Sequence, residues 1–237
     1  MTPAEMVTAI GSISGGEDTL KNYIKRERYG DLIDDTITFV PQYCFGQSSP
    51  GFDLIRLPNC TAIERSAFYL CLGVWSPTMV FAPKANIGNA YGGSVFYGCN
   101  RITIVVAKNI MKTENFRKYS DEMQLATVDL TNQTSSIENN NFNNCVNFKT
   151  LILRNTTPCA LGNIGAFVGT PFASGGTGGT IYIPKVLYDH LGDGTSLDYK
   201  AATNWSTIDG YGTITWAKIE GSIYETQYAD GTPIPSE

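Results

Sequence analysis

The chain has 237 residues, of which 42% are hydrophobic and 11% aromatic, enough to bury a core. Charged residues make up only 16%, and Asn, Thr, Ser and 24 Gly supply the polar surface, a composition that favours short strands and turns over long helices. A net charge of −5 without a basic block argues against a nucleic-acid partner, and no run approaches the roughly 18–20 apolar residues of a membrane span.

The first 32 residues differ from the rest of the chain. A short helix is predicted from Pro3 to about Ile13, with the proline in its first turn, and a second helix from about Glu17 to Tyr29. We expect residues 1–32 either to cap the domain that follows or to anchor it to a larger assembly. This N-terminus has neither the basic start nor the apolar core of a signal peptide, so synthesis without export by that route is expected.

From residue 33 onward the chain repeats itself. Six phenylalanines serve as markers and follow one another at intervals of 23, 28, 20, 26 and 25 residues, about 24 on average: Phe45, Phe68, Phe96, Phe116, Phe142 and Phe167. This period falls in the window of roughly 20–29 residues that is typical of leucine-rich repeats. The unequal intervals indicate insertions, which we place in loops.

A second apolar pattern keeps step with the phenylalanines and predicts one short strand per repeat. Apolar residues two positions apart indicate a strand with one buried face. The pattern occurs as Phe52-x-x-Ile55-x-Leu57, Ile102-x-x-Val105-x-Ala107, Leu125-x-x-Val128-x-Leu130 and Phe148-x-x-Leu151-x-Leu153.

Three cysteines each lie three residues after a marker phenylalanine: Cys71, Cys99 and Cys145. The position three residues after Phe116 is occupied by Tyr119. Tyrosine cannot take the place of a cysteine that binds a metal or forms a disulfide. The cysteines are therefore interpreted as small apolar side chains stacked along the interior, with disulfides or a metal site as the alternatives. Reduced thiols are also expected in a reducing compartment.

The repeat unit resembles the BspA-like leucine-rich repeat of bacterial surface proteins and of proteins encoded by bacteriophages. The family pattern, L-x-x-I-x-L-P followed by I-x-x-x-A-F-x-x-C, is clearest in FDLIRLPNCTAIERSAFYLC, Phe52–Cys71. The resemblance implies a β-rich leucine-rich-repeat solenoid of about six irregular repeats over residues 33–184. The entry LIDDTITFVPQYCF and the closing stretches GGTIYIPKVLYDHL and YKAATNWSTI are similar to those of phage-encoded members.

Residues 185–237 are expected to form a C-terminal cap, because a solenoid exposes apolar surface at its ends unless an atypical segment covers them. Ile181-x-Ile183 predicts a last strand, and KVLYDHL a short helix. Trp205 is a candidate plug over the final repeat, and the tail alternates enough to predict one or two further short strands.

Residue patterns for catalysis, cofactors and metals are weak. The single histidine, His190, has no matched acid or nucleophile in its motif, and Asp189, Asp193 and Asp198 lack the spacing of a calcium loop. The stretch ASGGTGGT, residues 173–180, lacks the Lys-Ser/Thr ending of a phosphate loop and precedes a strand instead of a helix. We therefore assign no catalytic, cofactor-binding or metal-binding residue, and expect no cofactor.

The favoured function is that of a non-enzymatic bacteriophage virion protein, in the tail or tail tip, which assembles in the host cytoplasm. Its expected partners are other virion proteins, a host-surface glycan or protein, and further copies of itself, without nucleic acid or a membrane span. A bacterial cell-surface adhesin is the alternative, and a glycan-degrading enzyme is the least favoured reading, since no carboxylate pair stands out.

A candidate binding face follows from the strand pattern. The positions between the buried pairs should point outward from the sheet, and they are Arg56, Phe81, Val106, Asp129 and Ile152. The apolar members would form a stripe that packs on another subunit or on the N-terminal segment. Isolated surface hydrophobes are the equally weighted alternative.

Overall fold

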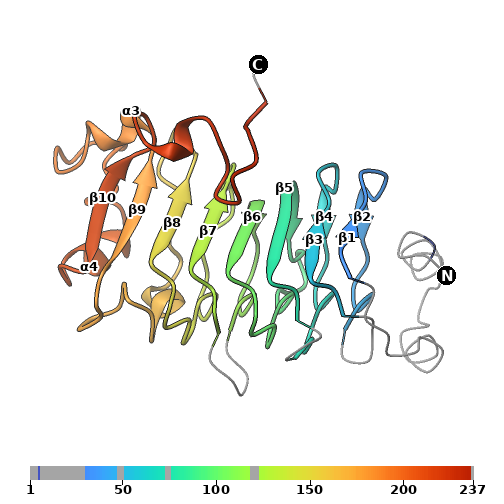
Figure 1. Cartoon of the computed structure of the whole chain (residues 1–237). Helices are drawn as coiled ribbons and strands as arrows, with labels where there is room; N and C mark the ends of the chain where they lie inside the picture. Colours follow the sequence, from blue (N-terminus) through green and yellow to red (C-terminus); the bar gives the residue numbers. More distant parts are fainter. Residues whose placement is uncertain (1–4, 6–29, 47–50, 73–75, 118–122, 236–237) are drawn as a thin grey trace.

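The structure is a computed structural model of the whole chain, and it describes residues 5, 30–46, 51–72, 76–117 and 123–235. Apart from Glu5, the residues of the helices expected over 3–13 and 17–29 lie outside the described residues, as does Tyr119. The rest forms one coil in which each turn adds a strand to a single sheet (Figure 1). The expected β-rich leucine-rich-repeat solenoid is therefore confirmed.

In the described residues the sheet has ten strands, and neighbouring strands all pair in parallel. Its main order is β1-β3-β5-β6-β7-β8-β9-β10, and a second, shorter path joins β2, β4 and the end of β5. The strands are β1 (Leu32–Ile33), β2 (Phe39–Val40), β3 (Leu54–Arg56), β4 (Ala62–Ile63), β5 (Met79–Ile87), β6 (Ile104–Ile110), β7 (Thr127–Leu130), β8 (Thr150–Leu153), β9 (Gly179–Ile183) and β10 (Ile214–Lys218). Four short helical segments have bounds within the described residues: η2 (Ile164–Phe167), α3 (Lys185–Tyr188), α4 (Trp205–Asp209) and η3 (Ile223–Glu225).

Strand register brings equivalent residues of successive repeats side by side. Six of them form a fully buried row that runs through the interior: Ile55, Val80, Val105, Val128, Leu151 and Ile181. Each strand side chain therefore packs on its equivalent in the next turn, which is why the alternation in the sequence predicted the buried face.

The marker phenylalanines form a second row in the interior, the phenylalanine ladder. All six are buried, and successive described rings stack with centroids 5.1, 5.2, 5.7, 5.9 and 5.5 Å apart from Phe45 to Phe167. Offset aromatic contacts at such distances add to the free energy gained from burial. The repeat period of the sequence therefore corresponds to phenylalanine rings in line along the solenoid.

Left-handed backbone positions flank the phenylalanines. Residues two positions before a marker have φ between 56° and 63°, and they are Tyr43, Ser66, Ser94, Glu114 and Asn140. Two positions after a marker, φ lies between 57° and 79° at Leu70, Gly98, Asn144 and Gly169. Glycine and asparagine adopt this conformation most easily, and they occupy four of these nine positions. The other five hold tyrosine, serine, glutamate or leucine.

The cysteines fill apolar slots and also join adjacent turns. All six are reduced and buried. The Cys71 and Cys99 thiols each donate a hydrogen bond, 3.0 Å long, to the carbonyl of the marker phenylalanine one turn earlier, and Cys145 does so over 3.2 Å to Phe116. Burial raises the pKa of the Cys60 thiol to about 11 and that of Cys159 to about 12.

The last turn is closed by aromatic residues from the C-terminal segment. Trp205 is fully buried with its ring 6.0 Å from that of Phe167, and its Nε1 donates to the Cys159 carbonyl over 2.8 Å. Tyr199 packs between Trp205 and Trp216 at 5.2 and 5.3 Å. Because β10 pairs with β9, residues after 184 also extend the sheet by one strand.

Candidate functional site

One row of side chains crosses the face of the sheet that points away from the interior. Register places its members next to one another in the order Ile33, Arg56, Phe81, Val106, Asp129, Ile152, Tyr182 and Ala217. We call this set the outer row. It contains all five residues of the candidate binding face, which therefore do lie together on one surface.

The outer row is largely covered instead of open. Val106, Asp129 and Ile152 are fully buried and Phe81 is 2% exposed, although none of them belongs to the interior core. Arg56 is half-buried, and Ile33, at the end of the row, is 60% exposed. The expectation that these positions face solvent, another subunit or the N-terminal segment therefore needs correction, because the described chain itself covers them.

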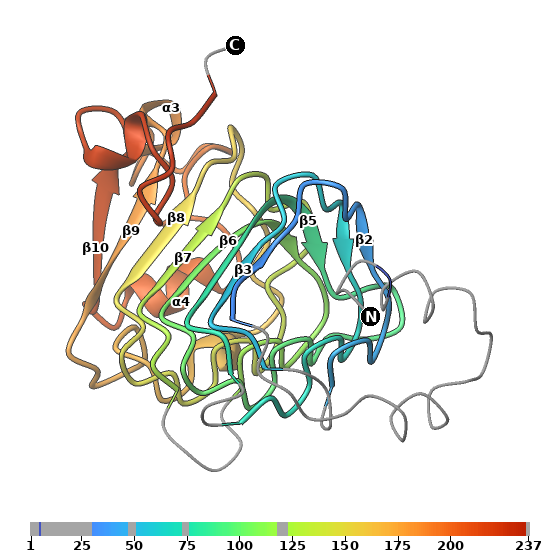
Figure 2. The same ribbon diagram turned by 45° about the vertical axis from the view of Figure 1, so that its right-hand side comes forward.

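The cover is the C-terminal segment, which turns back after β10 and lies against the strands before it (Figures 1 and 2). Its end folds into a hairpin over residues 226–234, the C-terminal hairpin. Gln227 and Pro233 form an antiparallel bridge, Tyr228 N donates to the Thr232 carbonyl over 2.8 Å, and Gly231 makes the turn with φ 84°. The expected strand in the tail is β10, and the hairpin was not anticipated.

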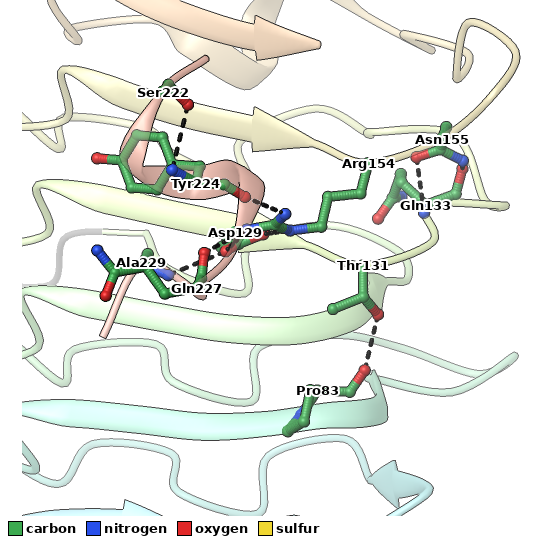
Figure 3. A network of polar contacts seen from close by, with 10 residues as sticks. All are labelled: Pro83, Asp129, Thr131, Gln133, Arg154, Asn155, Ser222, Tyr224, Gln227 and Ala229. Atoms are coloured by element: carbon green, nitrogen blue, oxygen red, sulfur yellow. Dashed lines mark hydrogen bonds and ion pairs between the residues drawn. The ribbon is translucent and has the colours of Figure 1, made fainter. Parts of the chain in front are cut away.

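The first attachment of the segment is the guanidinium of Arg154, which lies just after β8 (Figure 3). Its Nε and Nη2 donate to the two carboxylate oxygens of Asp129 over 2.7 and 2.8 Å. Its Nη1 and Nη2 also donate to the carbonyls of Tyr224 and Gln227 over 2.7 and 3.1 Å. Asp129 in turn accepts the Ala229 N–H over 3.0 Å. Burial raises the pKa of Asp129, and Arg154 acts in the opposite direction.

The second attachment joins the hairpin turn to β3 and β5. Arg56 donates to the Asp230 carboxylate over 3.2 Å and to the Thr232 hydroxyl over 3.0 Å, and its guanidinium lies 4.2 Å from the Phe81 ring centroid. The Tyr228 ring meets Phe81 edge to face at 5.6 Å. The hairpin thus contributes one aromatic ring and one carboxylate, and the sheet contributes cations and apolar side chains.

Sequence reasoning missed Arg154, Tyr228 and Asp230. Arg154 follows Asp129 by 25 residues, one repeat, so opposite charges at repeat spacing were an available signal. Nothing in the repeat pattern points to the two hairpin residues, because Arg56 and Asp230 are 174 positions apart.

A neighbouring row remains partly open. Register aligns Leu54, Met79 and Ile104 with a run of threonines, Thr127, Thr150, Thr180 and Thr215. All are half-buried except Thr215, which is exposed. On the turns of the coil, the Tyr69 and Tyr97 rings stack at 5.2 Å, and Tyr91 is 89% exposed. These side chains are at least partly accessible on the surface of the solenoid.

The remaining polar candidates do not converge. His190 Nδ1 lies 2.6 Å from Asp193, Asp189 pairs with Lys185, and Asp198 accepts the backbone N–H groups of Gly194 and Lys200. Within the described ranges no group of three or more His, Cys, Asp or Glu side chains could hold a metal ion. The glycine-rich stretch 173–180 forms turns that lead directly into β9.

A comparison with known families gives a match over the repeats. The family described as "BspA type Leucine rich repeat region" matches residues 38–164 in six copies. The chain belongs to this family. No curated protein and no solved structure gives a significant match. In the part of the chain that the structure describes, no helix is long and apolar enough to cross a membrane. Leucine-rich-repeat solenoids of this kind are scaffolds that expose rows of side chains, and they suit interaction with proteins or surfaces.

Proposed function

We propose that this chain is a non-enzymatic binding protein of a bacteriophage virion, placed in the tail or tail tip, where it contacts a host surface or neighbouring virion proteins. The observation that carries the binding function is the register of the coil, which presents equivalent side chains in rows on a rigid frame. Weak contacts by each copy add up when copies are arrayed in a particle. The virion assignment is supported by the resemblance of the entry and closing segments to phage-encoded members.

The test is to purify phage particles from cells that carry the gene and to analyse them by mass spectrometry and antibody labelling. The proposal expects the chain in the particle, at the tail, and expects the purified protein to slow adsorption of the phage when it is added to cells first. Particles that lack the chain would overturn the proposal.

The alternative is a bacterial cell-surface adhesin, which the same repeat family also supplies. The two proposals differ in location, so labelling of intact, uninfected cells separates them. Surface labelling that disappears after mild protease treatment of whole cells favours the adhesin. A third function, glycan hydrolysis, predicts release of reducing sugar from cell walls, and neither binding proposal does.

A further inference from the structure

We propose that the outer row is a recognition surface for a turn of another protein, one that carries an aromatic residue and, two positions later, a carboxylate. The C-terminal hairpin, with Tyr228 and Asp230, is then a built-in competitor that occupies the surface until such a partner displaces it. This inference rests on the proposed binding function and adds the chemistry of the partner.

The side chains beneath the hairpin have the composition of a protein-binding centre. Arg56 supplies a cation next to the ring of Phe81, and Val106 and Ile152 supply apolar area, a mixture that is enriched at the centres of protein interfaces. The surface meets its occupant through ring contact, a charge-assisted hydrogen bond and bonds to backbone carbonyls. A turn of another protein that presents an aromatic ring, a carboxylate and backbone carbonyls in the same order can make the same contacts with Phe81, Arg56 and Arg154.

The hairpin is separable from the solenoid. It contributes no side chain to the interior core, and every residue from Glu220 to Pro235 is half-buried or exposed, although the carboxylate of Asp230 is 1% exposed. Gly221, with φ 82° and no atom within 4 Å of the position of a Cβ, lies between β10 and the hairpin and offers a pivot. The hairpin can therefore leave while the turns of the solenoid, its rungs, stay packed.

The surface remains electrically balanced when the hairpin leaves. Arg154 and Asp129 both belong to the solenoid, so their ion pair persists and no buried charge is left alone. Water replaces the backbone groups of Gln227 and Ala229, and also that of Tyr224 because the pivot at Gly221 precedes it. An attached hairpin competes at an effective concentration on the order of millimolar, so a partner must bind well or be presented in many copies.

The experiment uses the full chain and a synthetic peptide of residues 221–235 as the probe. The double variant Tyr228→Ala/Asp230→Ala should free the surface and bind the peptide at least tenfold more tightly than the wild-type chain, as measured by calorimetry or by NMR titration. A peptide with both positions changed to alanine should bind neither protein, and adding Arg56→Ala to the double variant should abolish binding. Asp230→Asn, which keeps the size of the side chain, is the second variant. It should show a smaller gain in affinity for the peptide than the double variant does.

Equal binding of the peptide by wild-type chain and both variants, or binding by none of them, overturns the proposal. Dimers of the wild-type chain that vanish in the double variant, seen by light scattering, would assign the surface to a second copy and overturn the partner assignment. This binding experiment does not depend on where the protein is located. If the chain is absent from virions but the double variant still binds the peptide, the proposed function is refuted and this inference stands.

Discussion

Arg154 and Asp129 form a two-pronged ion pair between neighbouring turns of the solenoid, with Nε–Oδ1 and Nη2–Oδ2 distances of 2.7 and 2.8 Å. The side chain of Asp129 is fully buried and that of Arg154 is 13% exposed. The N–H groups of Arg154 also hold two carbonyls of the C-terminal segment. One guanidinium therefore neutralises a buried carboxylate and fastens the cover over the outer row.

Arg154→Ala should lower the free energy of unfolding by about 3 kcal/mol, because it leaves the Asp129 carboxylate buried without its partner. Lys200→Ala is the control, since Lys200 lies 3.8 Å from Asp209 in a surface ion pair, and it should change stability by less than about 1 kcal/mol. Urea denaturation measures both. Equal effects of the two substitutions would contradict the role given to Arg154.

Asp129→Asn should gain stability relative to wild type as pH rises from about 4 toward 7. The pKa of Asp129 is raised in the folded state, so the native carboxyl contributes stability below the unfolded pKa of about 3.9 and loses it as pH rises through the folded value. Asp193→Asn should lose stability relative to wild type as pH rises toward about 4 and change little above it, because hydrogen bonds accepted from Thr195 and His190 lower the pKa of this exposed carboxyl below its unfolded value. Urea denaturation at several pH values tests both signs, and a trend in Asp129→Asn that matches Asp193→Asn would refute the account.

Phe116→Ala should cost about 3–5 kcal/mol, because it removes a fully buried ring from the middle of the ladder and leaves a cavity between two neighbours. Val146→Ala removes a side chain that is 42% exposed and should change stability by less than about 0.5 kcal/mol. Thermal and urea denaturation report the difference. A small loss for Phe116→Ala would mean that the rungs do not depend on the ladder.

The interior could be predicted from sequence because each rung repeats the same local rules. Alternation placed Ile55 and Val105 inside, and the interval between phenylalanines placed Phe68 and Phe96 in line. The same alternation correctly placed the outer-row residues on the other face. It could not say what covers them, because the hairpin occurs once, has no period and reaches Arg56 from 174 positions away.

The cysteine thiols should resist alkylation by iodoacetamide at pH 8 in the native protein and should all react in urea. The thiolate is the reactive form, and burial raises the pKa of the Cys60 thiol to about 11 and that of Cys159 to about 12. All six side chains are also buried, which keeps the reagent away from the sulfur atoms. Reducing agent should leave the melting temperature unchanged, since all six thiols are reduced. Fewer than six labelled cysteines after unfolding without reductant would reveal a disulfide and contradict the structure.

Hydrogen exchange followed amide by amide tests the central claim most directly, namely that the rungs hold themselves together and that the C-terminal hairpin is a separable cover. The account predicts that the hairpin amides of Tyr228 and Ile234 exchange at least about tenfold faster than the rung amides of Phe96 and Phe142. Exchange of all four amides at one common rate would show a single cooperative unit and would contradict the account.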